Sequence, residues 1–178
     1  MRVHSVNHDT QHHFSKPPVP EITLIEGIGV EGDAHAGATV QHLHLIKVDA
    51  AAPNLRQVHL IQSELFAVLA EAGYEVGPGD LGENITTSGV DLLNLPTGTQ
   101  LHLGDTAVVT LTGLRNPCSQ INKFRKGLLK TMLHKDAAGE VVRLTGVMSV
   151  VNHGGVVRPD DQLKVVYADG PHEPLDLV

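Results

Sequence analysis

Apolar and polar residues alternate along most of the second half of the chain, and this alternation predicts short β-strands. Residues 106–114 are the clearest case, because Ala, Val, Leu and Gly occupy every second position. Gly, Asp, Asn and Pro separate one such segment from the next. The predicted strands are residues 3–6, 21–25, 43–48, 56–61, 81–87, 100–103, 106–114, 144–151 and 163–167.

Helical spacing occurs in only two segments. Residues 63–72 place Leu65 and Leu69 four positions apart, and Gly73 provides a natural end to the helix. Residues 119–133 form the second predicted helix, which four Lys and Arg residues make basic. Many short strands and few helices predict a mainly β fold, either a sandwich or a barrel. A chain of 178 residues fits a single domain, 1–178, with recognisable core motifs at about 21–168.

Composition limits the partners that we expect for this chain. The formal net charge is −7, and no basic block resembles a nucleic-acid tail or a membrane-binding patch. Aromatic residues make up only 3%, with no Trp, which disfavours a platform for stacked bases. No apolar run reaches the ~18–20 residues that span a bilayer, and the first residues lack the apolar core of a signal peptide. We therefore expect a cytoplasmic protein that binds neither nucleic acid nor membrane.

The single cysteine, Cys118, lies in the segment R-N-P-C-S-Q-I-N-K-F, residues 115–124. One cysteine excludes an intrachain disulfide and any metal site made of several thiolates. Arg115 and Lys123 would favour a reactive thiolate if they face the sulfur in space. A buried, inert thiol is the alternative, and the residues alone leave both interpretations open.

The glycine-rich segment G-I-G-V-E-G-D-A-H-A-G, residues 27–37, predicts tight turns. Its first six residues match the letters of a dinucleotide-binding motif. However, a polar run follows instead of a convincing helix, so nucleotide binding is not favoured.

Five segments taken together resemble the MOSC family, which is named for the C-terminal domain of molybdenum-cofactor sulfurase. They are residues 27–37, P-N-L-R-Q-V-H-L-I at 53–61, P-G-D-L-G-E-N-I-T-T-S-G-V-D-L-L-N-L-P-T-G-T at 78–99, R-N-P-C at 115–118, and G-V-M-S-V-V-N-H-G-G-V-V at 146–157. Each segment is short, but their order and spacing together are specific, especially to small stand-alone bacterial members. One departure is Asp160, which stands where the family usually has Gly.

The resemblance implies a β-barrel-like fold with a few peripheral helices and a pocket for a pterin-based molybdenum cofactor (molybdopterin). In relatives, the cysteine that corresponds to Cys118 is a proposed sulfur carrier or molybdenum ligand. Some members reduce N-hydroxylated small molecules with electrons from separate redox proteins, and others are fused to a pyridoxal-phosphate desulfurase domain. This chain has no such domain and no flavin or haem motif, so an external electron donor or a cysteine desulfurase is the expected partner.

Residues around Cys118 are candidates for binding the cofactor. Arg115 suits a phosphate through paired hydrogen bonds, and Asn116 and Asn122 suit the amide edge of a pterin. The alternative for Asn116 is that it shapes a turn before Pro117, and Asn122 is equally open.

Further candidates lie upstream in the chain. Glu83, Asn84 and Thr86, in G-E-N-I-T-T, offer donors and acceptors near the expected pocket or else satisfy a structural hairpin. Asp33 either caps a turn or accepts from a pterin nitrogen, and Arg56 binds either an anion or a surface carboxylate. His35 is a candidate catalytic proton donor, because its ordinary pKa lies near neutrality.

Twelve histidines are many for this length, and H-L-H places His42 and His44 on one face of the predicted strand 43–48. The pair suits zinc, but the sequence provides no third ligand.

Three functional hypotheses follow from these residues together with the resemblance. The leading hypothesis is a molybdenum-cofactor-dependent reductase with Cys118 as metal ligand. The alternative is a sulfur carrier that holds a persulfide on Cys118. A third hypothesis is a domain that only binds a small anion.

Overall fold

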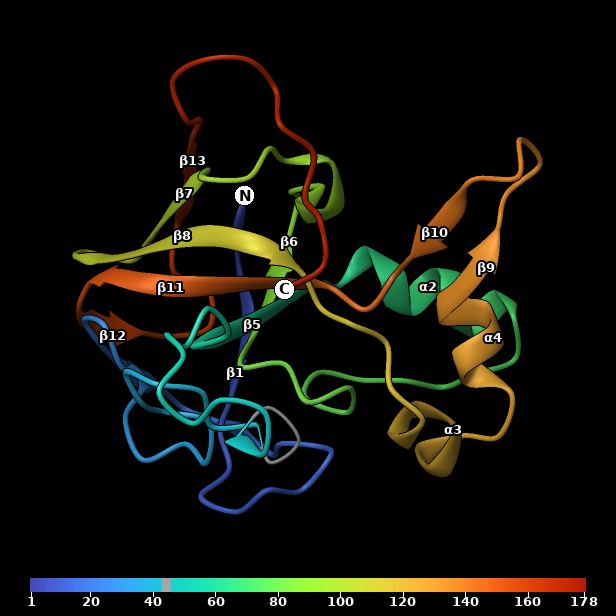
Figure 1. Ribbon diagram of the computed structural model, residues 1–178, viewed down its shortest axis with the longest axis horizontal. Coiled ribbons are helices and arrows are strands. Elements are labelled where there is room, and N and C mark those ends of the chain that lie inside the picture. Colours follow the sequence, from blue (N-terminus) through green and yellow to red (C-terminus); the bar gives the residue numbers. More distant parts are fainter. Residues whose placement is uncertain (43–45) are drawn as a thin grey trace.

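The alternation in the sequence becomes an alternation of buried and partly exposed side chains in the structure. Strand β8 (Ala107–Leu114) buries every second residue, and β7 (Gln100–Leu103) buries Leu101 and Leu103 in the same way. The structure is a computed structural model, and it describes residues 1–42 and 46–178 (Figure 1). These two strands confirm that the alternating pattern identifies sheet with one face toward a core.

The largest sheet contains eight strands in the order β13-β7-β8-β11-β5-β6-β1-β2. Neighbouring strands are antiparallel except β5 and β6, which run parallel and are connected through a helix. The remaining strands of this sheet are β1 Arg2–Asn7, β2 Pro18–Val19, β5 Val58–Gln62, β6 Ile85–Ser88, β11 Val147–His153 and β13 Leu163–Val166. A smaller sheet has the order β12-β3-β4, formed by Gly155–Val157, Ile22–Ile25 and Gly29–Val30. The main core takes its buried side chains from both sheets.

The mainly β prediction is confirmed, but the predicted closed barrel is not found, because the sheets of the described residues are open. The β1 strand approaches the turn before β13 through one bridge, between Arg2 and Gln162. Asp160 donates its amide to the Val3 carbonyl at 2.9 Å, and its φ is 70°. Asp160 therefore adopts the left-handed backbone that explains why glycine is usual at this position.

A second group of elements lies beside the large sheet, on the right of Figure 1. It comprises α2 (Glu64–Glu71), α3 (Gln120–Phe124), α4 (Leu128–Met132) and the hairpin of β9 (Leu133–Lys135) with β10 (Val141–Arg143). A separate core holds the three helices together, formed by Ile61, Leu65, Leu69, Leu81, Ile121, Leu128 and Met132. A short 3-10 helix, Leu92–Asn94, lies between β6 and β7. Among these helices, none has both the length and the apolar character that a bilayer crossing requires.

Three predicted elements differ from the structure. The predicted strand 81–87 begins only at Ile85 and runs to Ser88, because residues 81–84 belong to a loop. The predicted helix 119–133 is divided into α3 and α4, because Arg125 is extended and Gly127 has a φ of 91°, which a helix cannot accommodate. For the predicted strand 43–48, residues 43–45 lie outside the described residues, and the chain turns at Lys47 and Val48 instead of extending. The predicted helix 63–72 is confirmed as α2.

Glycines at two positions let the loop 77–84 pass directly against residues 14–16. Gly79 has a φ of 81°, and its carbonyl accepts a hydrogen bond from the Lys16 amide. The two backbones are therefore so close that a side chain at position 79 would collide with the Lys16 carbonyl. Gly82 has a φ of 83°, and an added Cβ would lie 2.5 Å from the Phe14 carbonyl oxygen. This backbone contact fixes Phe14 and Lys16 beside the segment that carries Glu83 and Asn84.

Candidate functional site

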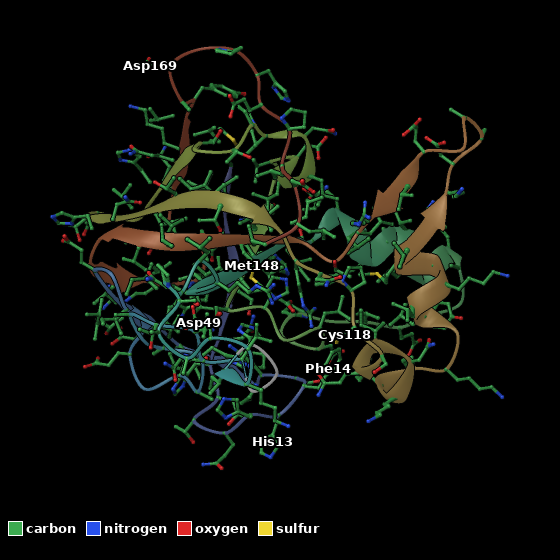
Figure 2. The ribbon with its side chains drawn as sticks, viewed as in Figure 1. His13, Phe14, Asp49, Cys118, Met148 and Asp169 are labelled. Atoms are coloured by element: carbon green, nitrogen blue, oxygen red, sulfur yellow. The ribbon has the colours of Figure 1, made fainter. Side chains whose placement is uncertain are left out.

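A cavity of about 190 Å³ opens between the large sheet and α3, where segments distant in sequence converge. The connection from β8 to α3 forms one wall, the N-terminal loop forms another, and β5 and β11 contribute His59 and Met148. Figure 2 shows Cys118 and Phe14 near each other at this junction, with Met148 toward the sheet. The predicted residues that line the cavity are Cys118, Arg115, Asn116, Arg56, Asn84 and His35.

The Cys118 thiol lies at the edge of the cavity, just before α3 begins. The side chain is partly exposed, and its sulfur lies 3.6 Å from Oε1 of Gln120 and within hydrogen-bonding reach of Arg115. The thiol is therefore not buried, in contrast to the alternative considered from sequence. An accessible sulfur at a cavity edge is available to bind a soft metal or to form a bond to another sulfur.

Arg115 is held in place as the neighbour of that thiol. Its Nη1 donates to the Leu81 carbonyl at 2.7 Å, and its own carbonyl accepts from the Thr145 hydroxyl at 2.6 Å. Burial lowers the pKa of Arg115, while Cys118, within hydrogen-bonding reach, and Glu83 oppose that shift. A guanidinium stays charged under such conditions, so Arg115 brings a fixed positive charge to the cavity.

A buried ion pair supports the opposite wall. The Lys16 Nζ lies 2.9 and 2.7 Å from the two carboxylate oxygens of Asp33, and both side chains are almost completely buried. Asn84 also donates to Asp33 at 3.0 Å. Burial alone would raise the pKa of Asp33, but hydrogen bonds from His35 and Lys16 and the Lys16 charge hold it well below its usual value. Burial lowers the pKa of Lys16, and Asp33 offsets part of that effect. Asp33 therefore lies behind the cavity wall and is not among its lining residues.

His35 lines the cavity with its orientation set by the same carboxylate. Its backbone amide donates to Asp33 Oδ1 at 2.9 Å, and its Nδ1 lies 3.3 Å from the same oxygen. An Nδ1–H that faces Asp33 leaves Nε2 as the nitrogen available to a ligand. The geometry is thus compatible with proton donation from His35.

Three other predicted residues face the protein instead of the cavity. Glu83 accepts hydrogen bonds from the Gly79 amide at 2.6 Å and from the Thr86 hydroxyl at 3.0 Å. The Thr86 hydroxyl is therefore used to bind the Glu83 carboxyl group. Asn122 lies on the exposed side of α3, where its Oδ1 accepts from the Leu129 amide at 3.0 Å. None of the three is among the residues that line the cavity.

Asn84 and Arg56 line the cavity but already have protein partners. Asn84 accepts from the His59 amide at 3.2 Å in addition to its bond to Asp33, so both ends of its amide are engaged. Arg56 donates to the carbonyl of Val178, and burial lowers the pKa of its guanidinium. These residues would therefore contribute to ligand binding mainly through the charge of Arg56 and the shape of the cavity wall, because protein groups already occupy most of their hydrogen-bonding atoms.

Sequence reasoning missed several lining residues, chiefly Lys16, Phe14, His13 and His59. The first three lie in the loop before β2, whose polar, proline-rich sequence predicts only a loop. His59 is buried in β5, and burial together with the Arg115 charge keeps its pKa well below the usual value. Its Nε2 lies 2.8 Å from the Thr145 carbonyl, so His59 is a neutral structural histidine. Strand β5 buries four consecutive residues, 58–61, so alternation along the strand gave no signal for His59.

The charge of the cavity wall is positive in a chain whose net charge is negative. Lys16, Arg56 and Arg115 line it, and no Asp or Glu of the described residues does. Asp33, behind the wall, balances Lys16 alone. The cavity therefore favours an anionic ligand, because three cationic side chains line it while the nearby carboxylates, Asp33 and Glu83, lie behind its wall.

The histidine-rich rim does not complete a metal site in the described part of the chain. His42 lines the cavity, and its ring centroid lies 4.8 Å from that of His35. His44 lies outside the described residues, so the zinc site predicted at His42 and His44 stays a prediction. Within residues 1–42 and 46–178, no three His, Cys, Asp or Glu side chains are arranged to hold a metal ion.

Glu83 makes a testable contribution to stability. Burial raises its pKa to about 7, because its contacts with the Gly79 amide and Thr86 only partly offset the loss of water. The unfolded carboxyl ionises near pH 4.3, so the folded state loses about 3 kcal/mol of stability as the pH rises from about 4 to about 7. We expect Glu83→Gln, which retains an acceptor oxygen, to remove most of this loss and to be more stable than wild type at pH 8.

Urea unfolding of both proteins between pH 5 and pH 8 measures this difference. Glu75→Gln is the matched control, because Glu75 is exposed and its removal should leave the pH profile unchanged. A Glu83→Gln profile parallel to that of wild type would show that Glu83 is ionised in the folded protein throughout this range.

Comparisons with known proteins agree with this architecture. The family model of the MOSC domain matches residues 9–164. The YuaD protein of Bacillus subtilis has a similar structure, with a TM-score of 0.74, 20% sequence identity, and coverage of 94% of this chain and 96% of that chain. YiiM from Geobacillus stearothermophilus gives a TM-score of 0.65 at 18% identity over 97% and 78% of the two chains. YiiM from Escherichia coli gives 0.62 at 22% identity over 97% and 73%. At these identities the structures establish a shared fold. The search of curated proteins gave no match.

Proposed function

Because this chain belongs to the MOSC domain family, we propose that its cavity binds a pterin-based molybdenum cofactor and reduces N-hydroxylated small molecules. The observation that carries the proposal is the accessible Cys118 sulfur at the edge of a cavity lined by cations without carboxylates. The family is associated with molybdenum-cofactor binding. The reductase activity and the residue roles are our own proposals.

The donor set fits such a cofactor. A thiolate is a soft ligand for molybdenum, and Cys118 is the one cysteine of the chain. Arg115 and Arg56 suit a phosphate, and the exposed Asn116 side chain suits the amide edge of a pterin. Asp33, Glu83, Thr86 and Asn122 would support or flank this site without contacting the cofactor.

The protein residues would control the proton and the geometry of the reaction. When bound, the cofactor supplies the two-electron redox centre. A hydroxylamine R–NHOH then takes up two electrons and two protons, the N–O bond breaks, and the products are R–NH₂ and water. His35 would protonate the departing hydroxyl through Nε2, and Asp33 would hold the ring by its contact with Nδ1. The electrons come from an external donor protein.

A turnover assay tests this proposal. The protein is purified from a molybdate-fed host and from a tungstate-fed host, and both are assayed with an aryl hydroxylamine and a viologen reductant. We expect amine formation only with the molybdate-grown protein. Equal rates for both preparations, or no amine in either, would refute the reductase.

The same thiol favours a second function, a sulfur carrier. A desulfurase persulfide would transfer its outer sulfur to the Cys118 thiolate, leaving Cys118 as a persulfide and the desulfurase cysteine as a thiol. Intact-mass measurement after incubation with a cysteine desulfurase and cysteine should then show a gain of about 32 Da, the mass of one sulfur atom in thiol–persulfide exchange. The gain should be absent from Cys118→Ala.

The third candidate, a domain that only binds a small anion, rests on the same cationic wall. Phosphate would then raise the melting temperature of wild type and Cys118→Ala equally, without turnover or sulfur transfer.

A further inference from the structure

The positive charge of this chain is concentrated beside the cavity. Residues 116–143, which we call the basic lobe, contain six Lys and Arg but only two Asp and Glu. The rest of the chain contains seven Lys and Arg against eighteen Asp and Glu. The lobe comprises α3, α4 and the β9–β10 hairpin, which Figure 1 shows to one side of the large sheet. A single-sign region in an acidic protein differs from the mixed charges of an ordinary solvated surface.

The cations of the lobe are accessible. Lys123, Arg125, Lys126, Lys130 and Lys135 are exposed. In the described part of the chain, the five salt bridges involve none of the lobe cations. Three of them, Lys123, Arg125 and Lys126, lie within four consecutive positions at the end of α3. Their fields therefore add over a small area, which attracts an acidic partner.

The lobe is in direct contact with the cavity wall. The Arg115 guanidinium lies 5.7 Å from the centre of the Phe14 ring, and both residues line the cavity. The Phe14 ring lies 5.7 Å from that of Phe124 on α3, and the Arg125 guanidinium lies 4.5 Å from the Phe124 ring. A continuous series of side-chain contacts therefore runs from the cavity to the exposed cations.

The sequence also places the lobe close to the thiol. Lys123 follows Cys118 by five residues and lies in the short helix α3, which begins just after the thiol. The buried Ile121 and Leu128 anchor the lobe in the same core as Leu65 and Leu69 of α2. A protein bound to the lobe would therefore be held at a defined position near the cavity mouth.

From these observations we propose that the basic lobe is the docking surface for a small acidic electron-carrier protein of the flavodoxin type. This inference rests on the proposed reductase, which needs an external donor. A compact acidic carrier can contact the lobe alone and place its redox group beside the cavity. Nucleic acid fits less well, because a long polyanion would extend over the acidic remainder of the protein, and the chain has few aromatic residues for base stacking.

Binding of a purified flavodoxin tests the docking surface without requiring turnover. We compare wild type, the lobe reversal Lys126→Glu/Lys130→Glu and the milder Lys126→Gln/Lys130→Gln by calorimetric titration; both lysines are exposed. The control is Lys47→Glu/Lys164→Glu, which reverses two exposed charges outside the lobe. We expect the double Glu variant of the lobe to bind flavodoxin about tenfold more weakly or worse, and the double Gln variant to lose less affinity. The control should lose about twofold at most. Wild-type binding should also weaken as salt rises from about 50 to about 200 mM.

Turnover separates this inference from the proposed function. With reduced flavodoxin as donor, the lobe reversal should slow amine formation, and with the viologen reductant its rate should match wild type. Equal losses in the lobe and control variants, salt-independent binding, or tighter binding of duplex DNA than of flavodoxin at equal salt would overturn the docking surface. If wild type gave no turnover with viologen, the reductase would fail, while lobe-dependent flavodoxin binding would still support the docking surface.

Discussion

Replacing Cys118 with alanine is expected to reduce hydroxylamine reduction on the order of a thousandfold or more, because the proposed metal ligand is removed. Cys118→Ser should be similarly inactive, because a hydroxyl is a hard and protonated ligand in place of a soft thiolate. Folding should be little affected, because the sulfur is partly exposed, its contact with Gln120 is weak, and its neighbour Arg115 is also held by the Leu81 carbonyl. Steady-state rates with the viologen reductant and urea unfolding curves measure the two effects separately.

Ser119→Ala is the matched control for this prediction. Ser119 is the exposed neighbour of Cys118, and its side chain makes no capping hydrogen bond to α3. The control should keep wild-type turnover and stability. Wild-type turnover in Cys118→Ala would show that the thiol has no part in the reaction.

The second large effect is expected from Lys16→Met, which breaks the buried pair with Asp33. The substitution keeps the apolar stem but leaves the Asp33 carboxylate buried without its cation. Removing one member of a buried ion pair typically costs 3–5 kcal/mol, so we expect a loss of about 4 kcal/mol in the free energy of unfolding at pH 7. Asp33 and His35 should also lose their fixed arrangement, which would lower turnover.

The pH dependence of this loss has a defined sign. In wild type the pKa of Asp33 is held below its unfolded value, so the pair stabilises the protein above about pH 4 and this contribution is lost as the pH falls further. The stability difference between wild type and Lys16→Met should therefore shrink below about pH 4. The double variant Lys16→Met/Asp33→Asn should recover part of the loss, and the exposed Lys164→Met should change nothing measurable. A loss from Lys16→Met below about 1 kcal/mol would mean that the ion pair is not maintained in solution.

The strands were largely predictable, because their alternation records which side chains face the core. β7 and β8 occur where the pattern places them, and α2 is present with Leu65 and Leu69 buried. The β9–β10 hairpin left no such signal, because β9 buries none of its residues. The approach of β1 to the turn at Asp160 was also unpredictable, because it is a contact between distant segments and not a local pattern.

The candidate site was predictable only in part for the same reason. Motifs identified Cys118, Arg115 and Asn84, which the structure brings to one cavity. Lys16 and Phe14 come from a loop whose local sequence shows nothing of its position, since that position depends on close backbone contact with Gly79 and Gly82. Glu83 and Asp33 were recognised as polar residues near the site. Their burial behind the wall depends on tertiary packing, which the sequence pattern does not specify.

The molybdenum content of the purified protein tests the central claim most directly. Wild type and Cys118→Ala are purified from the same molybdate-fed host, and molybdenum is measured by mass spectrometry together with the pterin released on denaturation. With Cys118 as metal ligand, we expect about one molybdenum atom per wild-type chain and a much lower content in the variant. Absence of molybdenum and pterin from wild type, or equal molybdenum in both proteins, would contradict the account.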